Sequence, residues 1–286
     1  MLRPTLASLS LALAHTALLT LPTLAQDPTF RPGNPGGPGS PGGPGMGPMN
    51  QTFEVLERFD ADKSKRLDAD ERKAARAWMK ENRPQRGRRG PGGPGGPPGE
   101  GAESTPDAAK KGATVAPADV KSYPDRPLFD ADIVRTFFFE FPQADWFDEL
   151  TDFYRTDVEL PATVTVDGVT YPEVGTAFRG NTSFMMARGR KKSLDLTFDF
   201  VNKQQHLYSV RHLDLLNCNE DPSFLREALH GNVANQFFPA QRVCLVRVVI
   251  NNEDYGLYAG VQQFDKEFLQ DHFGTTQGSR FKIPPD

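Results

Sequence analysis

The spacing of apolar residues predicts several strands in the C-terminal half of the chain. From Ser193 to Phe200 polar and apolar residues alternate, which is the period-2 pattern of a half-buried strand. The dipeptide Asp167-Gly168 lies between two further β-rich runs and is a strong signal for a two-residue hairpin turn. Together these patterns predict strands at 133–141, 158–166, 169–178, 193–200, 210–216, 242–250 and 255–261. The last two should form a second hairpin around the four residues Asn251-Asn252-Glu253-Asp254.

Three segments with helical periodicity are interspersed with these strands. The first is 145–154, and the last is 265–273, which Gly274 should cap. The middle one should open at Asp221-Pro222, with the aspartate as N-cap and the proline in the first turn. Its predicted buried side consists of Phe224, Leu225, Ala228, Leu229, Val233 and Phe237. Mixed strands and helices favour the α+β class, with a mixed or antiparallel sheet, for a domain spanning 128–286.

Composition limits the foldable part of the chain. Of its 286 residues, 26 are glycine and 25 are proline, and most of these precede residue 100, so we expect one main domain. The net charge of -4 gives no general attraction to nucleic acid or to anionic membranes. We therefore expect no nucleic-acid partner.

Residues 1–25 have the organisation of a secretory signal peptide. A short region containing Arg3 precedes an apolar run from Leu9 to Leu21 and the small-residue ending Thr23-Leu24-Ala25. The run is too short and too interrupted to span a bilayer, so we predict a secreted protein without stable membrane insertion. A retained membrane anchor is the alternative interpretation.

Two Pro/Gly-rich tracts, 26–49 and 84–127, predict disordered linkers. In the first, glycines recur every third residue, but the triplets are too few for a collagen helix, and an extended spacer is favoured. At the start of the second, a basic cluster precedes the Pro/Gly-rich run at 90–101 and suggests either contact with an anionic polymer or, preferably, a solvated linker. Its members are Arg83, Arg86, Arg88 and Arg89.

Between the linkers, residues 50–83 resemble an EF-hand, a small all-α helix-loop-helix that binds calcium. Loop positions one, three, five, seven, nine and twelve supply oxygen ligands to Ca²⁺, with a backbone carbonyl at position seven and a bidentate glutamate at twelve. These positions are occupied by Asp60, Asp62, Ser64, Arg66, Asp68 and Glu71.

Position six of this loop departs from the EF-hand pattern. It requires a sharp turn and normally carries glycine, whereas this chain has Lys65, for which a positive φ costs about 1 kcal/mol. The alternative to a calcium site is an acidic, solvated helical hairpin. We favour calcium, with a dissociation constant on the order of 0.1–1 mM for an isolated extracellular loop.

A second candidate site is the polar loop that follows the strand at 169–178. Backbone amides, hydroxyls and cations gather there in a short turn, which is chemistry suited to an anion. The loop carries Arg179, Gly180, Asn181, Thr182 and Ser183, followed by Arg188, Arg190, Lys191 and Lys192. From these residues alone a solvated basic loop is the simpler interpretation. Lys192 falls in phase with the apolar face of the next strand, so it either extends to water or points into a cleft.

An ordered set of motifs resembles the CotH family of spore-coat-type, secreted, kinase-like proteins. The set comprises Trp146, the Phe178–Ser183 loop, Lys191-Lys192-Ser193, Asp221, Val249-Ile250-Asn251, Tyr255-Gly256-Leu257-Tyr258 and Phe281-Lys282. The resemblance covers 128–286 and implies an atypical kinase-like fold that binds ATP with Mg²⁺ and phosphorylates secreted or surface proteins. It also implies that Arg179 and the Gly180–Ser183 loop face nucleotide phosphates, with Lys192 the first candidate for a phosphate-pairing lysine and Lys191 the second.

Two departures from this family affect the expected activity. Gln262 stands where similar proteins often carry an acidic residue, so the lysine–carboxylate pair of kinases is missing or is supplied elsewhere. The family's catalytic and metal-binding aspartates would be expected beyond Asp286, so the chain looks like the front portion of the domain, its catalytic residues are unknown and we do not expect it to be active alone. The alternative is a non-catalytic, calcium-dependent surface or matrix protein.

The remaining chemistry-bearing residues give weaker signals. His206, His212, His230 and His272 have no spacing typical of a zinc site. Cys218 and Cys244 are the only cysteines, and in an exported chain they form either a disulfide or, as we prefer, two buried thiols.

Overall fold

The computed structural model describes residues 52–82, 111–187, 189–278 and 281. The predicted signal peptide (1–25), the first predicted linker (26–49) and most of the second lie outside these residues, so they stay predictions. The described residues 111–127 of the second linker pack on the rest of the structure. For example, the N–H of Val115 donates to the carbonyl of Asn252 at 3.0 Å.

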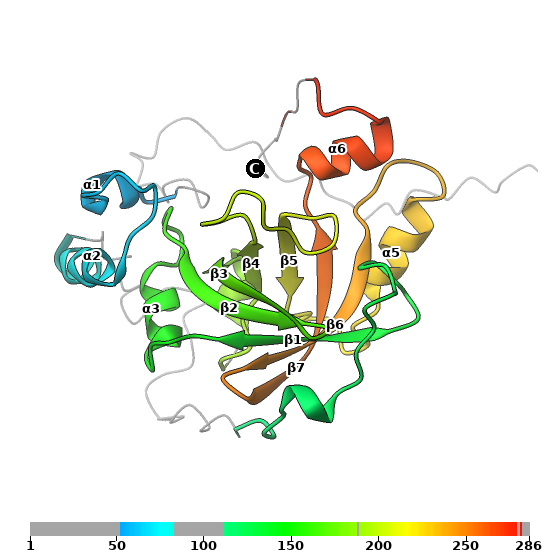
Figure 1. The fold of residues 1–286 in the computed structure, drawn as a ribbon, viewed down its shortest axis with the longest axis horizontal. Helices are drawn as coiled ribbons and strands as arrows, with labels where there is room; N and C mark the ends of the chain where they lie inside the picture. The colour runs from blue at the N-terminus through cyan, green and yellow to red at the C-terminus, as the bar shows by residue number, and fades with distance from the viewer. Residues whose placement is uncertain (1–51, 83–110, 188, 279–280, 282–286) are drawn as a thin grey trace, which may run out of the picture. The chain divides into compact units, whose positions relative to one another are not determined.

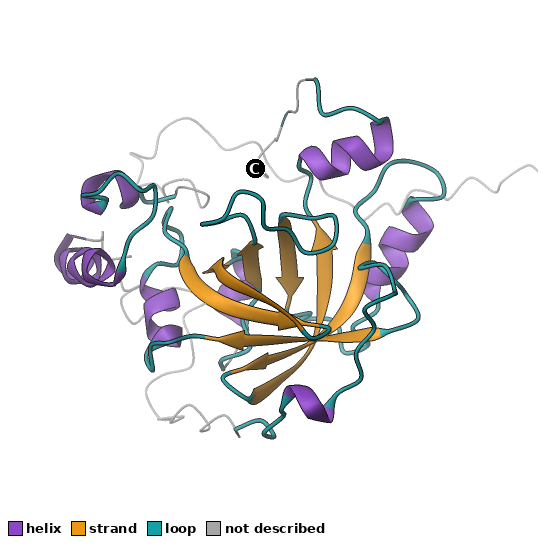
Figure 2. Ribbon diagram, in the orientation of Figure 1, coloured by secondary structure: helices purple, strands orange, loops and turns teal. Residues whose placement is uncertain are grey.

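The described residues contain seven strands and six α-helices (Figures 1 and 2). The strands are β1 (Val134–Glu140), β2 (Leu160–Val166), β3 (Val169–Phe178), β4 (Leu194–Thr197), β5 (His212–Leu216), β6 (Val243–Ile250) and β7 (Glu253–Gln262). The helices are α1 (Leu56–Phe59), α2 (Ala69–Asn82), α3 (Trp146–Asp152), α4 (Thr182–Met186), α5 (Arg226–Ala234) and α6 (Lys266–Phe273). A 3₁₀ turn covers Pro117–Asp119.

The strands form a closed barrel in the order β1-β2-β3-β4-β5-β7-β6. Neighbouring strands are antiparallel, except that β1 pairs with β6 in parallel and closes the barrel. The predicted α+β, kinase-like arrangement of an open sheet with helices is therefore wrong. Period-2 alternation shows which face of a strand is buried, but it does not show whether the sheet curls until its two edges meet.

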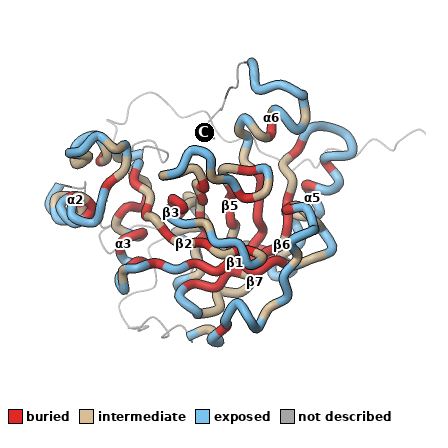
Figure 3. Tube along the Cα trace, viewed as in Figure 1, coloured by how far each residue is buried: buried red, intermediate tan, exposed pale blue. Residues whose placement is uncertain are grey.

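The interior of the barrel is the main hydrophobic core (Figure 3). Every strand contributes to it, with side chains such as Phe137, Val164, Val174, Leu196, Leu213, Val246 and Tyr258. The register shifts in β2–β3 and β6–β7, as expected where bulges increase the local twist of a strand and help a sheet to curl.

Both predicted hairpins are present, and their turns follow from backbone preferences. Asp167 and Gly168 have φ of 50° and 81°, as the predicted two-residue turn requires. The second turn is shorter than the predicted four residues because Asn251 and Asn252 both adopt positive φ, and β7 begins at Glu253.

The prediction for the buried face of α5 is wrong. Leu229 and Val233 are 58% and 55% exposed, and Phe237 beyond the helix is 78% exposed. The helix instead presents Gly231 and Ala234 to the barrel, since these small residues permit close approach. A Cβ on Gly231 would lie 2.8 Å from the carbonyl oxygen of Gln241. The helix also begins at Arg226, after a turn in which Asp221 accepts the N–H groups of Ser223 and Arg226.

The two cysteines are free, as the preferred interpretation expected, but only Cys244 is buried and Cys218 is half-buried. Cys244 belongs to the barrel interior, whereas Cys218 packs with Val243 and Ala259 in a separate cluster. Burial raises the pKa of the Cys244 thiol to about 12. Among the described residues, no helix has both the length and the apolar character needed to cross a membrane.

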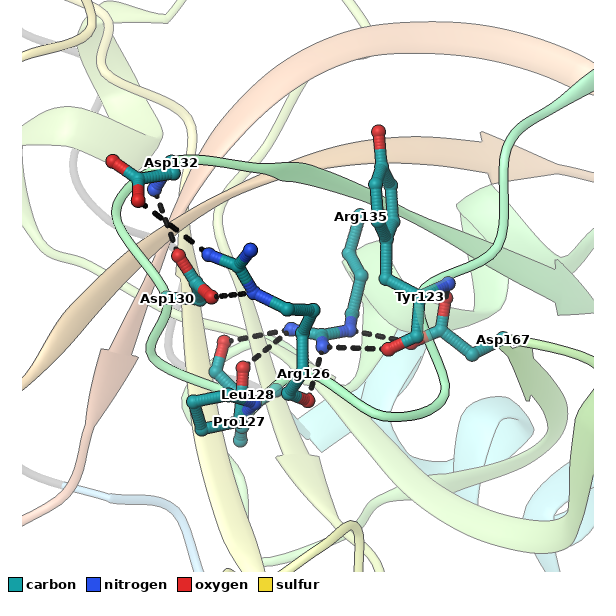
Figure 4. A network of polar contacts seen from close by, with 8 residues as sticks. All are labelled: Tyr123, Arg126, Pro127, Leu128, Asp130, Asp132, Arg135 and Asp167. Carbon is teal, nitrogen blue, oxygen red and sulfur yellow. Dashed lines mark hydrogen bonds and ion pairs between the residues drawn. The ribbon is translucent and has the colours of Figure 1, made fainter.

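A buried arginine fixes one end of β1 (Figure 4). Arg135 has a fully buried side chain, forms an ion pair with Asp167 of the β2–β3 turn and packs on the ring of Tyr208. Its guanidinium also donates to four backbone carbonyls, those of Tyr123, Arg126, Pro127 and Leu128. One side chain of β1 thereby joins the segment before this strand to the β2–β3 turn.

We expect Arg135→Met to be strongly destabilising. The substitution removes the cationic partner of Asp167, which keeps only its hydrogen bonds from Tyr123 and Tyr208, and it leaves the four carbonyls without the guanidinium donor. Breaking a buried ion pair in this way costs about 3–5 kcal/mol. Urea unfolding should show this loss. The neighbouring Arg126, whose side chain is 47% exposed, pairs with Asp130 and Asp132, so Arg126→Met is the control and should change the midpoint far less. Similar midpoints for the two variants would contradict the role of Arg135.

Candidate functional site

The carboxylates of the predicted calcium loop converge in the structure. Oxygens of Asp60, Asp62 and Glu71 lie within 4.8 Å of one another. The other predicted ligands are close by, since the hydroxyl of Ser64 donates to the carbonyl of Arg66 at 2.9 Å. Asp68 accepts the N–H of Glu71 at 2.9 Å and so caps the start of α2. The arrangement offers a hard cation several oxygens from a single loop.

Backbone N–H groups hold these carboxylates in place. Asp60 accepts from Ser64 and Lys65 at 2.8 and 2.9 Å, and Glu71 accepts from Ala61 and Asp68 at 2.7 and 2.9 Å. Hydrogen bonds from Ser64 lower the pKa of Asp62. Lys65 has φ of 64°, so it adopts the backbone conformation that glycine would favour at position six. The loop therefore has the required turn despite its departure from the pattern.

The second candidate site is the predicted Arg179–Ser183 loop, of which 179–181 connect β3 to α4 and Thr182 and Ser183 form the first residues of that helix. Gly180 has φ of 92°, and a Cβ there would lie 2.2 Å from the hydroxyl of Ser183. The loop thus requires glycine both for its backbone conformation and for space. Arg179 pairs with Asp214 of β5, and Asn181 accepts a hydrogen bond from Arg155 at 2.6 Å. The side chain of Thr182 and residue Arg188 lie outside the described part of the chain.

The two adjacent lysines have different surroundings. Lys192 turns back onto α4, where its ammonium donates to the carbonyls of Phe184 and Ala187 at 2.9 and 2.6 Å. Lys191 is partly buried, with its ammonium 4.6 Å from the ring centroid of Phe224 and 4.9 Å from that of Tyr258. Burial lowers the pKa of both lysines.

Lys191 lines a cavity of about 390 Å³ below the 217–224 segment. An adjoining cavity of about 370 Å³ shares Asn217, Cys218 and Asp221 and includes Ser183 of the glycine loop. The two cavities thus connect the lysine to the loop.

A third group of ionisable residues lies beside the glycine loop. Asp195 and Asp214 face each other across β4 and β5, and the amide of Gln263 donates to both, at 2.7 and 3.0 Å. Glu159 precedes β2 and accepts a hydrogen bond from Thr197 at 2.8 Å. Burial raises the pKa of Asp195, and it raises the pKa of Glu159 to about 7.

Comparison with known proteins identifies the class of the C-terminal region. Residues 176–284 match a family described as CotH kinase protein. The match confirms the resemblance to CotH, a family of kinase-like spore-coat proteins, from the last residues of β3 onward, whereas the extension of the resemblance over 128–175 stays a prediction. No curated protein matches this chain. The EF-hand resemblance of 50–83 stays a prediction.

Sequence reasoning missed the residues that attach the calcium loop to the barrel. Arg72 of α2 pairs with Glu149 of α3 at 2.9 Å, and both side chains are buried. Arg76 contacts Asp145 and Asp152 at 2.7 and 2.8 Å. The sequence did contain a signal for these contacts. The two arginines are four residues apart, and the three acidic residues follow at spacings of four and three, which places each set on one face of its helix.

The raised pKa of Glu159 predicts a pH-dependent stability. Because its pKa rises from 4.5 to about 7, the folded protein holds this proton more tightly than the unfolded chain between those values. Stability should therefore fall as pH rises through this window, with a slope of up to about 1.4 kcal/mol per pH unit from this group.

Urea unfolding between pH 4.5 and 8 would measure this slope. Glu159→Gln should flatten the profile and be more stable than the parent at pH 8, while Glu81→Gln, at an exposed position on α2, serves as control. Parallel profiles for all three proteins would show that Glu159 does not titrate in this range.

Proposed function

We propose that this chain is a secreted calcium-binding protein whose CotH-type region binds ATP with Mg²⁺. The observation that carries the calcium proposal is the convergence of three carboxylates, from Asp60, Asp62 and Glu71, within 4.8 Å. Secretion is supported by the sequence of residues 1–25 alone.

Calcium is favoured over other cations by the number and kind of oxygens in the loop. Ca²⁺ takes six to eight oxygen ligands in flexible geometry, and the Glu71 carboxylate at position twelve is suited to bidentate binding. Mg²⁺ requires a near-ideal octahedron with shorter bonds and is usually bound through only one or two carboxylates. A loop with four acidic side chains and a carbonyl therefore fits calcium better.

Calorimetric titration of the chain with CaCl₂ tests this site. We expect one site with a dissociation constant on the order of 0.1–1 mM. Glu71→Gln should abolish binding because a neutral amide cannot supply the bidentate carboxylate. Asp70→Asn is the matched control, since Asp70 is an exposed neighbour at a loop position that supplies no ligand. Absence of heat at 10 mM calcium, or equal affinity for Glu71→Gln, would remove the site.

The nucleotide proposal rests on the CotH match together with the two adjoining cavities. The cavities provide Lys191 and the hydroxyls of Ser183 and Ser193, which are groups that commonly bind phosphate, and Ser183 connects them to the loop that contains Gly180. Of the two candidate lysines, Lys191 is on the cavity wall, whereas Lys192 holds α4 against the loop. We infer that Lys191 pairs with phosphate oxygens and that Lys192 shapes the loop.

Binding of ATP·Mg²⁺ to Lys191→Met and Lys192→Met distinguishes these roles. A hydrogen bond to a charged group contributes about 1.5–3 kcal/mol, so Lys191→Met should weaken binding roughly 10- to 100-fold. Lys192→Met should have a smaller effect on affinity and a larger one on thermal stability. Equal affinity for the parent and Lys191→Met would contradict the assignment.

The proposed phosphoryl acceptors are secreted or surface proteins, as the resemblance to CotH implies. Calcium binding without ATP binding would instead favour the second candidate function, a non-catalytic calcium-dependent surface or matrix protein.

A further inference from the structure

We propose that calcium bound in the 60–71 loop stabilises the conformation of the Arg179–Ser183 loop. Calcium would act on this loop indirectly. The helix-loop-helix, residues 52–82, contacts the segment 153–157 after α3, and that segment contacts the Arg179–Ser183 loop. This inference rests on the proposed calcium site and extends it, since it assigns regulation of the glycine loop to calcium.

The first link joins the calcium loop to α3 through Arg72. This residue directly follows Glu71, the last ligand of the loop, and its guanidinium donates at 2.9 Å both to Glu149 and to the carbonyl of Leu67 inside the loop. The ion pair is buried, so its geometry is strongly favoured once formed. A loop that loses its fold would lose the Leu67 contact, and the orientation of Arg72 toward α3 would change with it.

The second link joins the start of the helix-loop-helix to the segment 153–157. Asp157 accepts the N–H groups of Val55 and Leu56 at 2.8 and 3.1 Å, and the N–H of Phe53 donates to the carbonyl of Arg155 at 2.8 Å. Phe53 also stacks on Trp78 of α2 with ring centroids 5.7 Å apart. Both ends of the helix-loop-helix are therefore held against the α3 region.

The third link joins the same short segment to the glycine loop. The hydroxyl of Tyr154 donates to the carbonyl of Gly180, and Arg155 donates to the side chain of Asn181 at 2.6 Å. The ring of Tyr154 stacks on Phe184 of α4, with centroids 3.6 Å apart. A cavity of about 320 Å³ at this junction is lined by residues of all three parts, including Thr52, Arg155 and Asn181.

The two states that calcium would bias are the helix-loop-helix packed on α3 and the same segment detached from it. A ligand that binds only the folded, packed loop raises the ratio of packed to detached molecules by the factor 1 + [Ca²⁺]/Kd, which is about 100-fold at 100 times Kd. Because residues 154 and 155 also hold Gly180 and Asn181, the glycine loop gains order in the packed state.

Hydrogen exchange of the whole chain, measured with and without 10 mM CaCl₂, tests this inference. We expect calcium to slow amide exchange in 60–72 and also about 5-fold or more in 179–184. The variant Glu71→Gln should show neither effect. Asp157→Ala should keep calcium binding and the protection of 60–72 but lose the protection of 179–184, whereas Asp157→Asn retains an acceptor and should behave like the parent.

Calorimetry on the same samples separates failure of this inference from failure of the calcium site. Heat of binding with unchanged exchange in 179–184 overturns the inference and leaves the calcium site intact. Absence of heat removes both. Should Asp157→Ala fail to fold, Arg155→Met breaks the Asn181 contact by another route. Full calcium protection of 179–184 in a folded Arg155→Met or Asp157→Ala protein also overturns the inference.

Discussion

The structure depends on the parallel pairing of β1 with β6, which closes the barrel. Residues 134–139 of β1 pair in register with 245–250 of β6. Without this pairing, the sheet would have two edges with unsatisfied backbone groups, and the aromatic side chains of β1 would lie at a margin rather than in a core. The pairing also fixes the position of α3, because α3 is the next element after β1. Since the helix-loop-helix packs on α3, its position depends on a strand pairing between segments that are distant in sequence.

This non-local pairing explains which parts of the fold could be predicted. Both hairpins were predictable, because Asp167-Gly168 and the Asn251-Asn252 turn impose their geometry locally. Closure of the barrel was not predictable, since the alternation of polar and apolar residues in β1 or β6 does not show which strand it pairs with. The face of α5 was predicted wrongly for a related reason. Periodicity ranked Leu229 and Val233 as core residues, but the barrel wall admits only the small side chains of Gly231 and Ala234 at that distance.

The two candidate sites show the same contrast between local geometry, which the sequence predicts, and non-local packing, which it does not. The predicted calcium ligands lie within twelve consecutive residues, so their spacing could be read from the sequence, and the structure brings the carboxylates of Asp60, Asp62 and Glu71 together. The environments of the lysines could not be predicted from strand phase. Lys192 appeared in phase with the core because the strand was extended back to residue 193, yet β4 begins at Leu194 and the preceding residues follow no alternation. Lys192 contacts carbonyls of α4 and its neighbour lines the cavity, a difference set by the loop's own fold.

The charges on α3 indicate that the helix-loop-helix is an integral part of the domain. Asp145, Glu149 and Asp152 lie within two turns on one side of the helix, where like charges repel. Glu149 is buried, and a buried carboxylate without a partner is strongly destabilising. Arg72 and Arg76 pair with all three carboxylates, so removing the helix-loop-helix would leave this acidic cluster without its arginine partners. If a cation binds and orders the loop beside Arg72, as we propose, it would also act on the stability of the barrel, because the loop and α3 share the buried Arg72–Glu149 ion pair.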